Sequence, residues 1–353
     1  MQQAEPTVEF GVFDWIDSRD APLEQIYEQR LQLLEYADRS GFFCYHLAEH
    51  HFTPLGLAPS PLLFLSAVAQ RTGRLRLGPL VCLLPLYNPL RLLGELCMLD
   101  QMSGGRLELG VGRGVSPYEL GYHGVDASQT REIFREALSV LVAGFTSSRL
   151  SFKGQFYSFD NVPLVLRPMQ QPYPPLWYAT STMESIPWAA ERGMNLMRLG
   201  PAKAMREGTD LYERVWTEHR DDPNRLNPQV EQPRVGMNRQ IFLAQTDGEA
   251  QAIAATAFRD WFRSFNQLWE AFGDTTYARR GQYEALLESE TLLIGSPERV
   301  RGMIERAFVD SGCNYMGLSF AWGSLTHEQS LSSMKLFVEQ VMPAFLGGWG
   351  RAR

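Results

Sequence analysis

Short apolar runs alternate with amphipathic helical stretches along the whole chain, and this alternation restricts the fold more than any other feature. It is typical of βα units, in which each helix returns the chain so that successive strands run parallel. Eight such runs, each followed by a helical pattern, predict an α/β fold, a (β/α)8 TIM barrel in preference to an open doubly wound sheet. The predicted strands are Val8–Phe13, Phe43–Leu47, Leu75–Leu83, Leu107–Gly112, Leu176–Ala179, Asn195–Leu199, Arg239–Ala244 and Tyr315–Phe320.

Two segments do not fit a simple βα repeat. Residues 144–175 place Phe152, Phe156 and Tyr157 among glycines and prolines, which predicts a small hairpin insertion after the fourth strand. Residues 266–296 form a long polar and aromatic stretch after the seventh strand. Loops of that length in compact domains are usually functional lids or disordered segments. We therefore expect one barrel domain over residues 1–353 with insertions after strands four and seven.

Composition narrows the class of protein. The 353 residues carry a formal net charge of -7, which argues against a nucleic-acid partner. Prolines and arginines interrupt the most apolar span, residues 75–93, so no membrane helix is expected. Residues 1–6 lack the basic and apolar regions of a signal peptide, and the four cysteines show no CxxC spacing. These observations predict a cytoplasmic protein with reduced thiols.

An aromatic strand runs directly into two adjacent histidines, in the segment Phe42-Phe-Cys-Tyr-His-Leu-Ala-Glu-His-His-Phe52. Parallel α/β folds keep their chemistry at the carboxyl ends of the strands, so we interpret this pair as functional. One alternative is that the histidines are polar residues satisfied at a strand end. A second is a metal site on Glu49, His50 and His51, which is disfavoured because adjacent side chains on a strand point opposite ways.

A glycine-rich segment surrounds the fourth strand, from Asp100-Gln-Met-Ser-Gly-Gly-Arg106 to Gly110-Val-Gly-Arg-Gly114. Glycines at a strand end allow a planar ring to approach closely, and Arg113 offers a planar donor fork suited to phosphate. A dinucleotide-binding turn would instead open a helix in the first βαβ unit. This segment is mid-chain and continues into Val115-Ser-Pro117, which excludes that interpretation.

Three segments resemble the bacterial luciferase-like flavin-dependent monooxygenases, and most closely the luciferase α-type subunit of the alkanal monooxygenases. They are Leu47-Ala-Glu-His-His-Phe-Thr-Pro-Leu-Gly-Leu57, the glycine-rich segment, and Ser333-Met-Lys-Leu-Phe-Val-Glu-Gln-Val-Met-Pro343. The resemblance spans nearly the whole chain. It implies that His50 acts beside the reactive edge of a flavin, as acid/base or hydrogen-bond partner, and that Glu119 is an acidic residue near it.

The same resemblance implies an FMN site. The third strand would pass under the flavin with a non-proline cis peptide at Leu80–Val81, and Arg113 and Arg131 would contact the phosphate. Residues 176–188 form a strand that leads through hydroxyl residues into a helix, and they would be a further phosphate-binding site. The alternative is that Ser181 and Ser185 cap the helix. The cofactor-binding residues so implied are Leu80, Val81, Gly112, Arg113, Arg131, Ala179, Thr180, Ser181, Glu184 and Ser185.

The implied activity is that of the oxygenase half of a two-component monooxygenase. A separate NAD(P)H:flavin reductase would supply reduced FMN, which would react with O2 to a C4a-peroxide and oxidise a small apolar aldehyde, ketone or related compound. The alternatives are a deazaflavin-dependent hydride-transfer oxidoreductase and a non-catalytic flavin-binding dimer partner. A homodimer through the helices with Leu92, Leu96 and Leu99 is expected. This chain has Gly112 where luciferase α has a reactive cysteine. The resemblance therefore does not decide whether the protein emits light or which substrate it uses.

Overall fold

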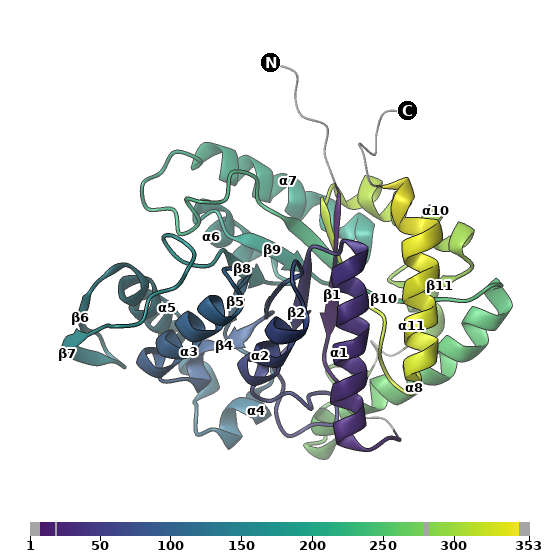
Figure 1. Cartoon of the computed structure of the whole chain (residues 1–353), viewed down its shortest axis with the longest axis horizontal. Coiled ribbons are helices and arrows are strands. Elements are labelled where there is room, and N and C mark those ends of the chain that lie inside the picture. Colours follow the sequence, from purple (N-terminus) through teal and green to yellow (C-terminus); the bar gives the residue numbers. More distant parts are fainter. Residues whose placement is uncertain (1–7, 18–19, 279–281, 346–353) are drawn as a thin grey trace.

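The computed structural model describes residues 8–17, 20–278 and 282–345, and its centre is a sheet of parallel strands (Figure 1). The sheet order is β3-β2-β1-β12-β10-β9-β8-β5-β4. The strands in chain order are β1 (Glu9–Asp14), β2 (Cys44–Leu47), β3 (Arg76–Pro79), β4 (Cys82–Leu83), β5 (Leu109–Gly112), β8 (Leu176–Ala179), β9 (Asn195–Arg198), β10 (Val235–Leu243) and β12 (Tyr315–Ser319).

The sheet closes on itself, because its two ends, β3 and β4, are consecutive parts of the predicted third strand. β3 pairs with β2, β4 pairs with β5, and a parallel bridge joins Leu77 to Leu107. The predicted TIM barrel is therefore confirmed. An additional strand, β11 (Leu292–Gly295), pairs with the second half of β10 and was not predicted.

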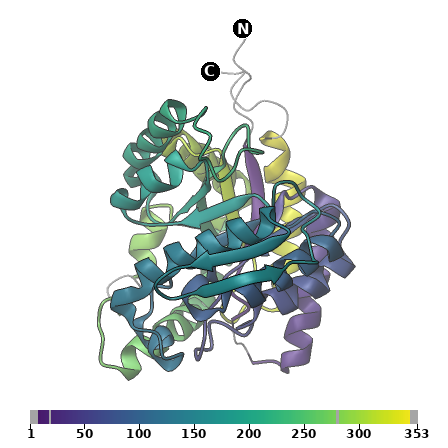
Figure 2. The same cartoon turned by 90° about the vertical axis from the view of Figure 1, so that its left-hand side faces the viewer.

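Helices cover the outside of the barrel (Figures 1 and 2). α1 ends where the sequence indicates, because Gly41 takes a φ of 87° that few other residues adopt. No helix of the described residues is long and apolar enough to cross a membrane. The helices are α1 (Leu23–Ser40), α2 (Pro61–Arg71), α3 (Pro89–Met102), α4 (Pro117–Tyr122), α5 (Thr130–Thr146), α6 (Ile186–Glu191), α7 (Ala202–Glu218), α8 (Asp247–Ala271), α9 (Tyr283–Glu288), α10 (Pro297–Ser311) and α11 (His327–Leu336).

Both insertions are present. The hairpin prediction is confirmed: β6 (Arg149–Lys153) and β7 (Ser158–Pro163) form a separate antiparallel pair at the left edge of Figure 1, facing the viewer in Figure 2. The second insertion is mostly regular structure, so its interpretation as a loop was wrong. α8 extends into this insertion as far as Ala271, and α9 and β11 follow. Residues 279–281 of this insertion lie outside the described residues.

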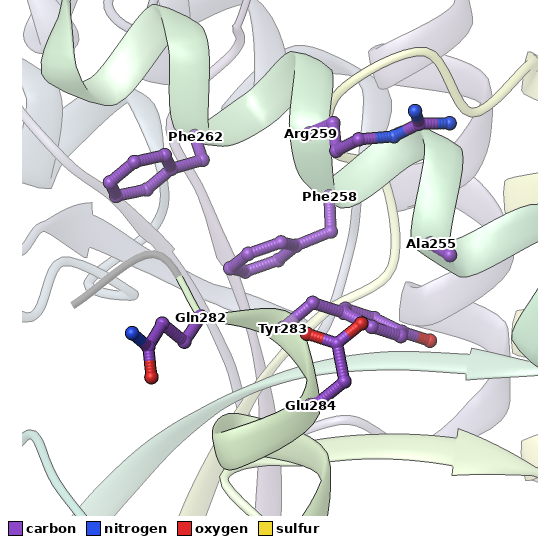
Figure 3. Close-up of a pocket in the computed structure, with 7 residues that line it drawn as sticks. All are labelled: Ala255, Phe258, Arg259, Phe262, Gln282, Tyr283 and Glu284. Atoms are coloured by element: carbon purple, nitrogen blue, oxygen red, sulfur yellow. The ribbon is translucent and has the colours of Figure 1, made fainter. Parts of the chain in front are cut away.

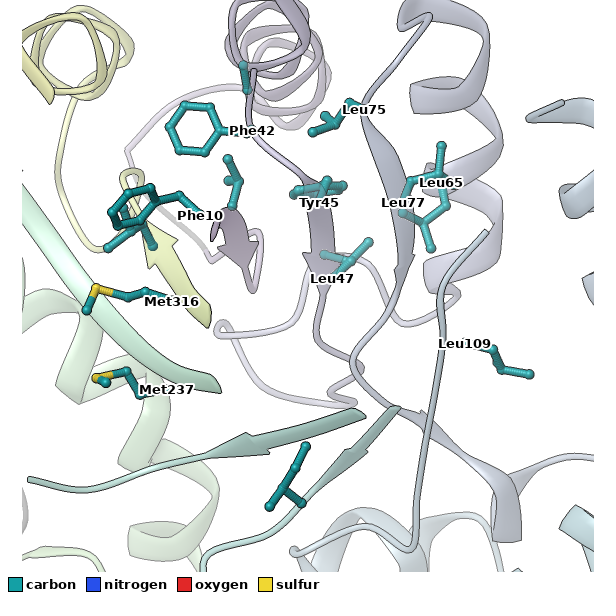
Figure 4. Packing of buried hydrophobic residues seen from close by; sticks show 14 of the residues in the cluster. Phe10, Phe42, Tyr45, Leu47, Leu65, Leu75, Leu77, Leu109, Met237 and Met316 are labelled. Carbon is teal, nitrogen blue, oxygen red and sulfur yellow. The ribbon is translucent and has the colours of Figure 1, made fainter. Parts of the chain in front are cut away.

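The main core lies between the barrel and its helices (Figure 4). Tyr45 and Leu77 point outward from β2 and β3 and pack with Leu65 of α2. Because successive side chains on a strand alternate in direction, the residue after Tyr45 points into the barrel. The predicted dimer leucines of α3, Leu92, Leu96 and Leu99, are buried in this core and are therefore not available to a second subunit, which corrects that expectation.

A layer of aromatic and imidazole side chains fills the inside of the barrel. The buried His46 bonds through Nε2 to the hydroxyl of Tyr315 at 2.9 Å, and its ring lies 4.8 Å from that of Trp177. A Cβ on Gly11 would lie 1.8 Å from the Tyr315 hydroxyl oxygen, so the interior tolerates only glycine there. Burial lowers the pKa of His46 from 6.5 to about 3, so the imidazole is neutral in the folded protein.

We expect His46 to make the fold sensitive to acid. Between pH 6.5 and 3 the unfolded chain binds a proton that the folded chain does not, so stability falls as the pH falls through this range. At pH 4 the loss is roughly 3 kcal/mol relative to pH 7. Urea unfolding of His46→Gln should show a flatter pH dependence than the unaltered protein. His219→Gln is the control, because the side chain of His219 is 41% exposed, and an equally flat profile for it would contradict this assignment.

Candidate active site

The two predicted catalytic residues lie together at the carboxyl ends of the strands. His50 follows β2, and its Nδ1 is 3.2 Å from Oε1 of Glu119, a residue 69 positions away on α4. The His50 side chain is 21% exposed, whereas that of Glu119 is 7% exposed. Among the described residues, the Nε2 atom of His50 has no hydrogen-bond partner. The carboxylate therefore orients an imidazole whose other nitrogen is free to act on a ligand.

The local chain conformation fixes both residues of this pair. The loop after β2 folds back so closely that a Cβ on Gly56 would lie 2.6 Å from the Cβ of His50. Ser116 caps α4 by accepting the N–H of Glu119 at 3.3 Å. The second carboxylate oxygen of Glu119 accepts the N–H of His51 at 3.2 Å. These contacts hold the imidazole with little freedom, as an acid/base group requires.

His51 belongs to a different pair. Its Nε2 is 2.9 Å from Oε1 of Glu49, and the other oxygen of Glu49 accepts the N–H of Leu83 at 2.9 Å. The two imidazoles thus have separate carboxylate partners. No group of three or more His, Cys, Asp or Glu side chains within residues 8–17, 20–278 and 282–345 is placed to hold a metal ion.

The third and fourth strand ends approach each other closely. The Leu80–Val81 peptide is cis, as the resemblance implied, and lies between β3 and β4. A Cβ on Gly112 would lie 2.3 Å from Cγ2 of Val81, so the absence of a side chain at position 112 allows this contact. The structure thus brings three of the predicted cofactor-binding residues, Leu80, Val81 and Gly112, to one place.

We expect Gly112→Ala to destabilise the protein by about 1–3 kcal/mol, because Val81 has a stiff β-branched side chain that cannot easily move aside. Urea denaturation measures this loss. Gly121→Ala on α4 is the matched control, since no atom outside its own helix lies within 4 Å of a Cβ built there. Equal stability of the two variants would contradict the packing argument.

The two predicted phosphate-binding arginines have no counter-ion within residues 8–17, 20–278 and 282–345. Arg113 follows β5 and is half-buried, whereas Arg131 lies in the first turn of α5 and is exposed. In the described part of the chain, no carboxylate is within salt-bridge distance of either, and no hydrogen bond joins Arg131 to another predicted site residue. Both guanidinium groups are therefore free to bind an anion.

The predicted hydroxyl cluster lies beyond β8. The N–H of Thr180 donates to the carbonyl of Met197 at 3.0 Å. The Thr182 hydroxyl lies 3.2 Å from that of Thr180 and 3.0 Å from that of Ser185. The capping alternative is wrong, since Ser185 precedes α6 but its side chain makes no cap hydrogen bond. Ala179, Ser181 and Glu184 are exposed beside this cluster.

Helix α8, about 37 Å long at 1.5 Å per residue, crosses the carboxyl ends of several strands. It packs closely against the loop after β12, because a Cβ on Gly323 would lie 1.9 Å from the carbonyl oxygen of Ala257. The ring of Trp261 lies 5.4 Å from that of Trp15, which follows β1. Ser264 accepts the hydroxyl of Thr53 at 2.8 Å. The helix therefore forms a roof over this end of the barrel.

The end of the roof rests on α4, where the hydroxyl of Tyr118 donates to Asp274 at 2.9 Å. Residues of this roof were not predicted as part of the site. The signal that could have revealed them is an aromatic residue at every fourth position, Trp261, Phe265 and Trp269, on one face of a helix. On another face of α8, a cavity of about 550 Å³ lies beside α9 and is lined by Phe258, Phe262 and Tyr283 (Figure 3).

The barrel and the carboxylate-held imidazole at its carboxyl end define an α/β-barrel enzyme. Residues 8–315 match the family model described as luciferase-like monooxygenase, so the chain belongs to this family. Protein y4wF of Sinorhizobium fredii is 39% identical over 334 residues, which cover 94% of this chain and 96% of that protein. The oxygenase component of the flavin-dependent trigonelline monooxygenase of Acinetobacter baylyi is 27% identical, with 91% of each chain covered.

Solved structures agree with this assignment. The monooxygenase RslO1 of Streptomyces bottropensis is 27% identical with a TM-score of 0.85, over 96% of this chain and 99% of that one. An FMN complex of the oxygenating constituent of 3,6-diketocamphane monooxygenase of Pseudomonas putida shares the fold at 20% identity and a TM-score of 0.77, over 96% and 98% of the chains. An F420-dependent secondary alcohol dehydrogenase also shares the fold. It is 19% identical with a TM-score of 0.71, over 97% of this chain and 100% of that one. The family and these relatives support an oxidoreductase that uses a flavin.

Proposed function

We propose that this chain is the oxygenase half of a two-component monooxygenase, with reduced FMN as its cofactor and a small apolar carbonyl compound or a related molecule as its substrate. The observation that carries the proposal is the imidazole of His50, held through Nδ1 by Glu119 with Nε2 free. The named relative from Acinetobacter is the oxygenase component of such a system.

The residues present fit a flavin with a phosphate tail. Arg113 and Arg131 would hold the phosphate, because both lack a counter-ion in the described part of the chain. Val81 and Gly112 lie together at the ends of β4 and β5, where the resemblance implies that the flavin ring is bound. When bound, reduced FMN would supply the electrons for the activation of dioxygen, as the resemblance implies.

His50 would hold or deliver a proton beside the reacting atoms, and Glu119 would position it. The roof of α8 would exclude water from the same space, which protects a reactive cofactor from side reactions. A separate flavin reductase and a second copy of this chain are the partners that the resemblance implies. A monomeric mass in solution would contradict the homodimer.

Oxygen incorporation separates this proposal from deazaflavin-dependent hydride transfer, which the shared fold of the F420-dependent dehydrogenase makes the second candidate. The purified protein would be mixed with a flavin reductase, NADH, FMN, a panel of ketones and aldehydes, and heavy-isotope dioxygen. We expect the product mass to include one heavy oxygen atom. Turnover only with a deazaflavin, without isotope uptake, would overturn the proposal, and absence of turnover with either would favour a non-catalytic partner.

A further inference from the structure

Four buried polar side chains on β10 and β12 have atoms without a partner within the described residues. One of them, Arg239, is directed to the outer face of β10 by the alternation of the strand, and the other three are Asn238, Gln240 and Ser319. Asn238 and Gln240 are each 7% exposed, and Ser319 is fully buried. The Oδ1 of Asn238, the Nε2 of Gln240 and the Oγ of Ser319 make no hydrogen bond within the described residues. Buried polar groups are nearly always hydrogen-bonded in folded proteins, so three such groups on two paired strands require an explanation.

These side chains face the inside of the barrel. A Cβ on Gly317 would lie 3.5 Å from Oδ1 of Asn238, 3.4 Å from Cε of Met197 and 3.5 Å from Cβ of Phe13. Met197 and Phe13 belong to the apolar cluster inside the barrel. Asn238 pairs in register with Gly317, and Gln240 with Ser319, two residues nearer the carboxyl ends. Since side chains two apart on a strand share a face, all three line one interior wall.

The surroundings of this wall indicate what it binds. Phe13 stacks edge-on with Trp15 at 4.9 Å, and Trp15 meets Trp261 of the roof at 5.4 Å. Arg239, which lies between the two amides in sequence, is directed to the opposite face by the alternation of the strand. The interior wall therefore offers hydrogen bonds from two amides and a hydroxyl, without a formal charge. This chemistry matches a neutral carbonyl or hydroxyl group on an apolar body, and not a carboxylate.

We propose that Asn238, Gln240 and Ser319 form the polar end of the substrate-binding site and hold the substrate through a neutral oxygen atom. This inference rests on the proposed function, and it specifies the substrate class of that site. The oxygen atom of the substrate accepts from the amide of Gln240 or the hydroxyl of Ser319. Its apolar body lies among Phe13, Trp15 and Met197. The donors of Gln240 and Ser319 remain unsatisfied until the substrate binds, and they select against analogues that lack the oxygen. The Oδ1 of Asn238 is an acceptor, so a hydroxyl on the substrate would satisfy it and a carbonyl oxygen would not.

The test compares two ligands that differ only in this oxygen. Cyclooctanone and methylenecyclooctane have the same ring, and calorimetric titration of the full chain with FMN present measures the affinity of each. We expect the ketone to bind at least about tenfold more tightly. Gln240→Met with Ser319→Ala should remove that difference and also raise the Tm of the ligand-free protein, because unsatisfied buried polar groups are replaced by apolar ones. Cyclooctanecarboxylate should bind no more tightly than methylenecyclooctane.

Control variants make every outcome decisive. Gln229 also has an unpartnered buried oxygen, but it lies beside Tyr173 and outside the barrel interior, so Gln229→Met should keep the ketone preference. If the double variant fails to fold, the single variants Gln240→Met and Ser319→Ala replace it, and at least one of them should reduce the ketone preference. Equal binding of ketone and alkene, no ketone binding, or a preference that survives in the variants would mean that the groups hold an internal water only, and would overturn the inference. Loss of FMN binding with the ketone preference intact would overturn the proposed function alone.

Discussion

Replacing His50 by alanine is expected to lower turnover by about 100-fold or more, which is the usual contribution of a positioned acid/base group. Flavin binding should remain, because the resemblance places the phosphate and the strand ends elsewhere, at Arg113 and Gly112. Steady-state turnover with excess reductase measures the first quantity, and fluorescence titration with FMN measures the second. The reason for the large effect is that Glu119 holds the imidazole of His50 through Nδ1, while Nε2 has no hydrogen-bond partner among the described residues.

His123→Gln is the matched control for this variant. His123 is exposed, and its ring lies 4.6 Å from that of His51, so it shares the neighbourhood without contacting the proposed reacting atoms. We expect near-normal turnover for it. Glu119→Gln should show a smaller loss than His50→Ala, because it alters the orientation of the imidazole and leaves the imidazole itself. Unchanged turnover in His50→Ala would remove His50 from the mechanism.

Replacing Arg113 and Arg131 together by methionine is expected to weaken FMN binding by about 100-fold, since hydrogen bonds to a charged group contribute roughly 1.5–3 kcal/mol each. Riboflavin lacks the phosphate, so its affinity should not change. Fluorescence titration with both flavins separates loss of the phosphate contact from general damage to the site. This comparison is possible because neither arginine is committed to an ion pair within the described residues.

Arg135→Met provides the control for the arginine variant. Arg135 is exposed on α5 one turn beyond Arg131 and presents the same change of charge. We expect it to bind FMN normally. If both flavins lose affinity equally in the double variant, the arginines support the structure of the site and do not contact phosphate. If neither flavin loses affinity, the phosphate lies elsewhere.

The barrel could be predicted because its strands are short, apolar and separated by helical periodicity. The same criterion failed where polar residues enter a strand. β10 begins at Val235, but the predicted strand began at Arg239, because Gly236 and Asn238 interrupt the apolar pattern of its first four residues. β11 has only four residues and follows an irregular segment, so its Leu-Leu-Ile run was assigned to the insertion. Sequence rules fail most often at functional positions, and the interior of β10 fits that expectation.

The resemblance could propose residues for the candidate site, but it could not give their geometry. The resemblance named His50 and Glu119, but no local pattern shows that residues 69 positions apart share a hydrogen bond. That contact depends on the return of the chain through β3, α3 and β5. The contribution of α8 was missed because its roof position depends on contacts with Thr53, in the loop after β2, and Tyr118, on α4, which are far away in the sequence.

The position of α8 also affects how readily such an enzyme can acquire a new substrate. The surface under the proposed flavin site is formed by the ends of several barrel strands. The surface on the opposite side is formed by one contiguous stretch of 25 residues, α8. Exchange of that stretch between relatives would reshape the space above the cofactor and leave the groups that hold the cofactor in place. New substrate specificities can therefore arise in this architecture by replacement of a single segment of the chain.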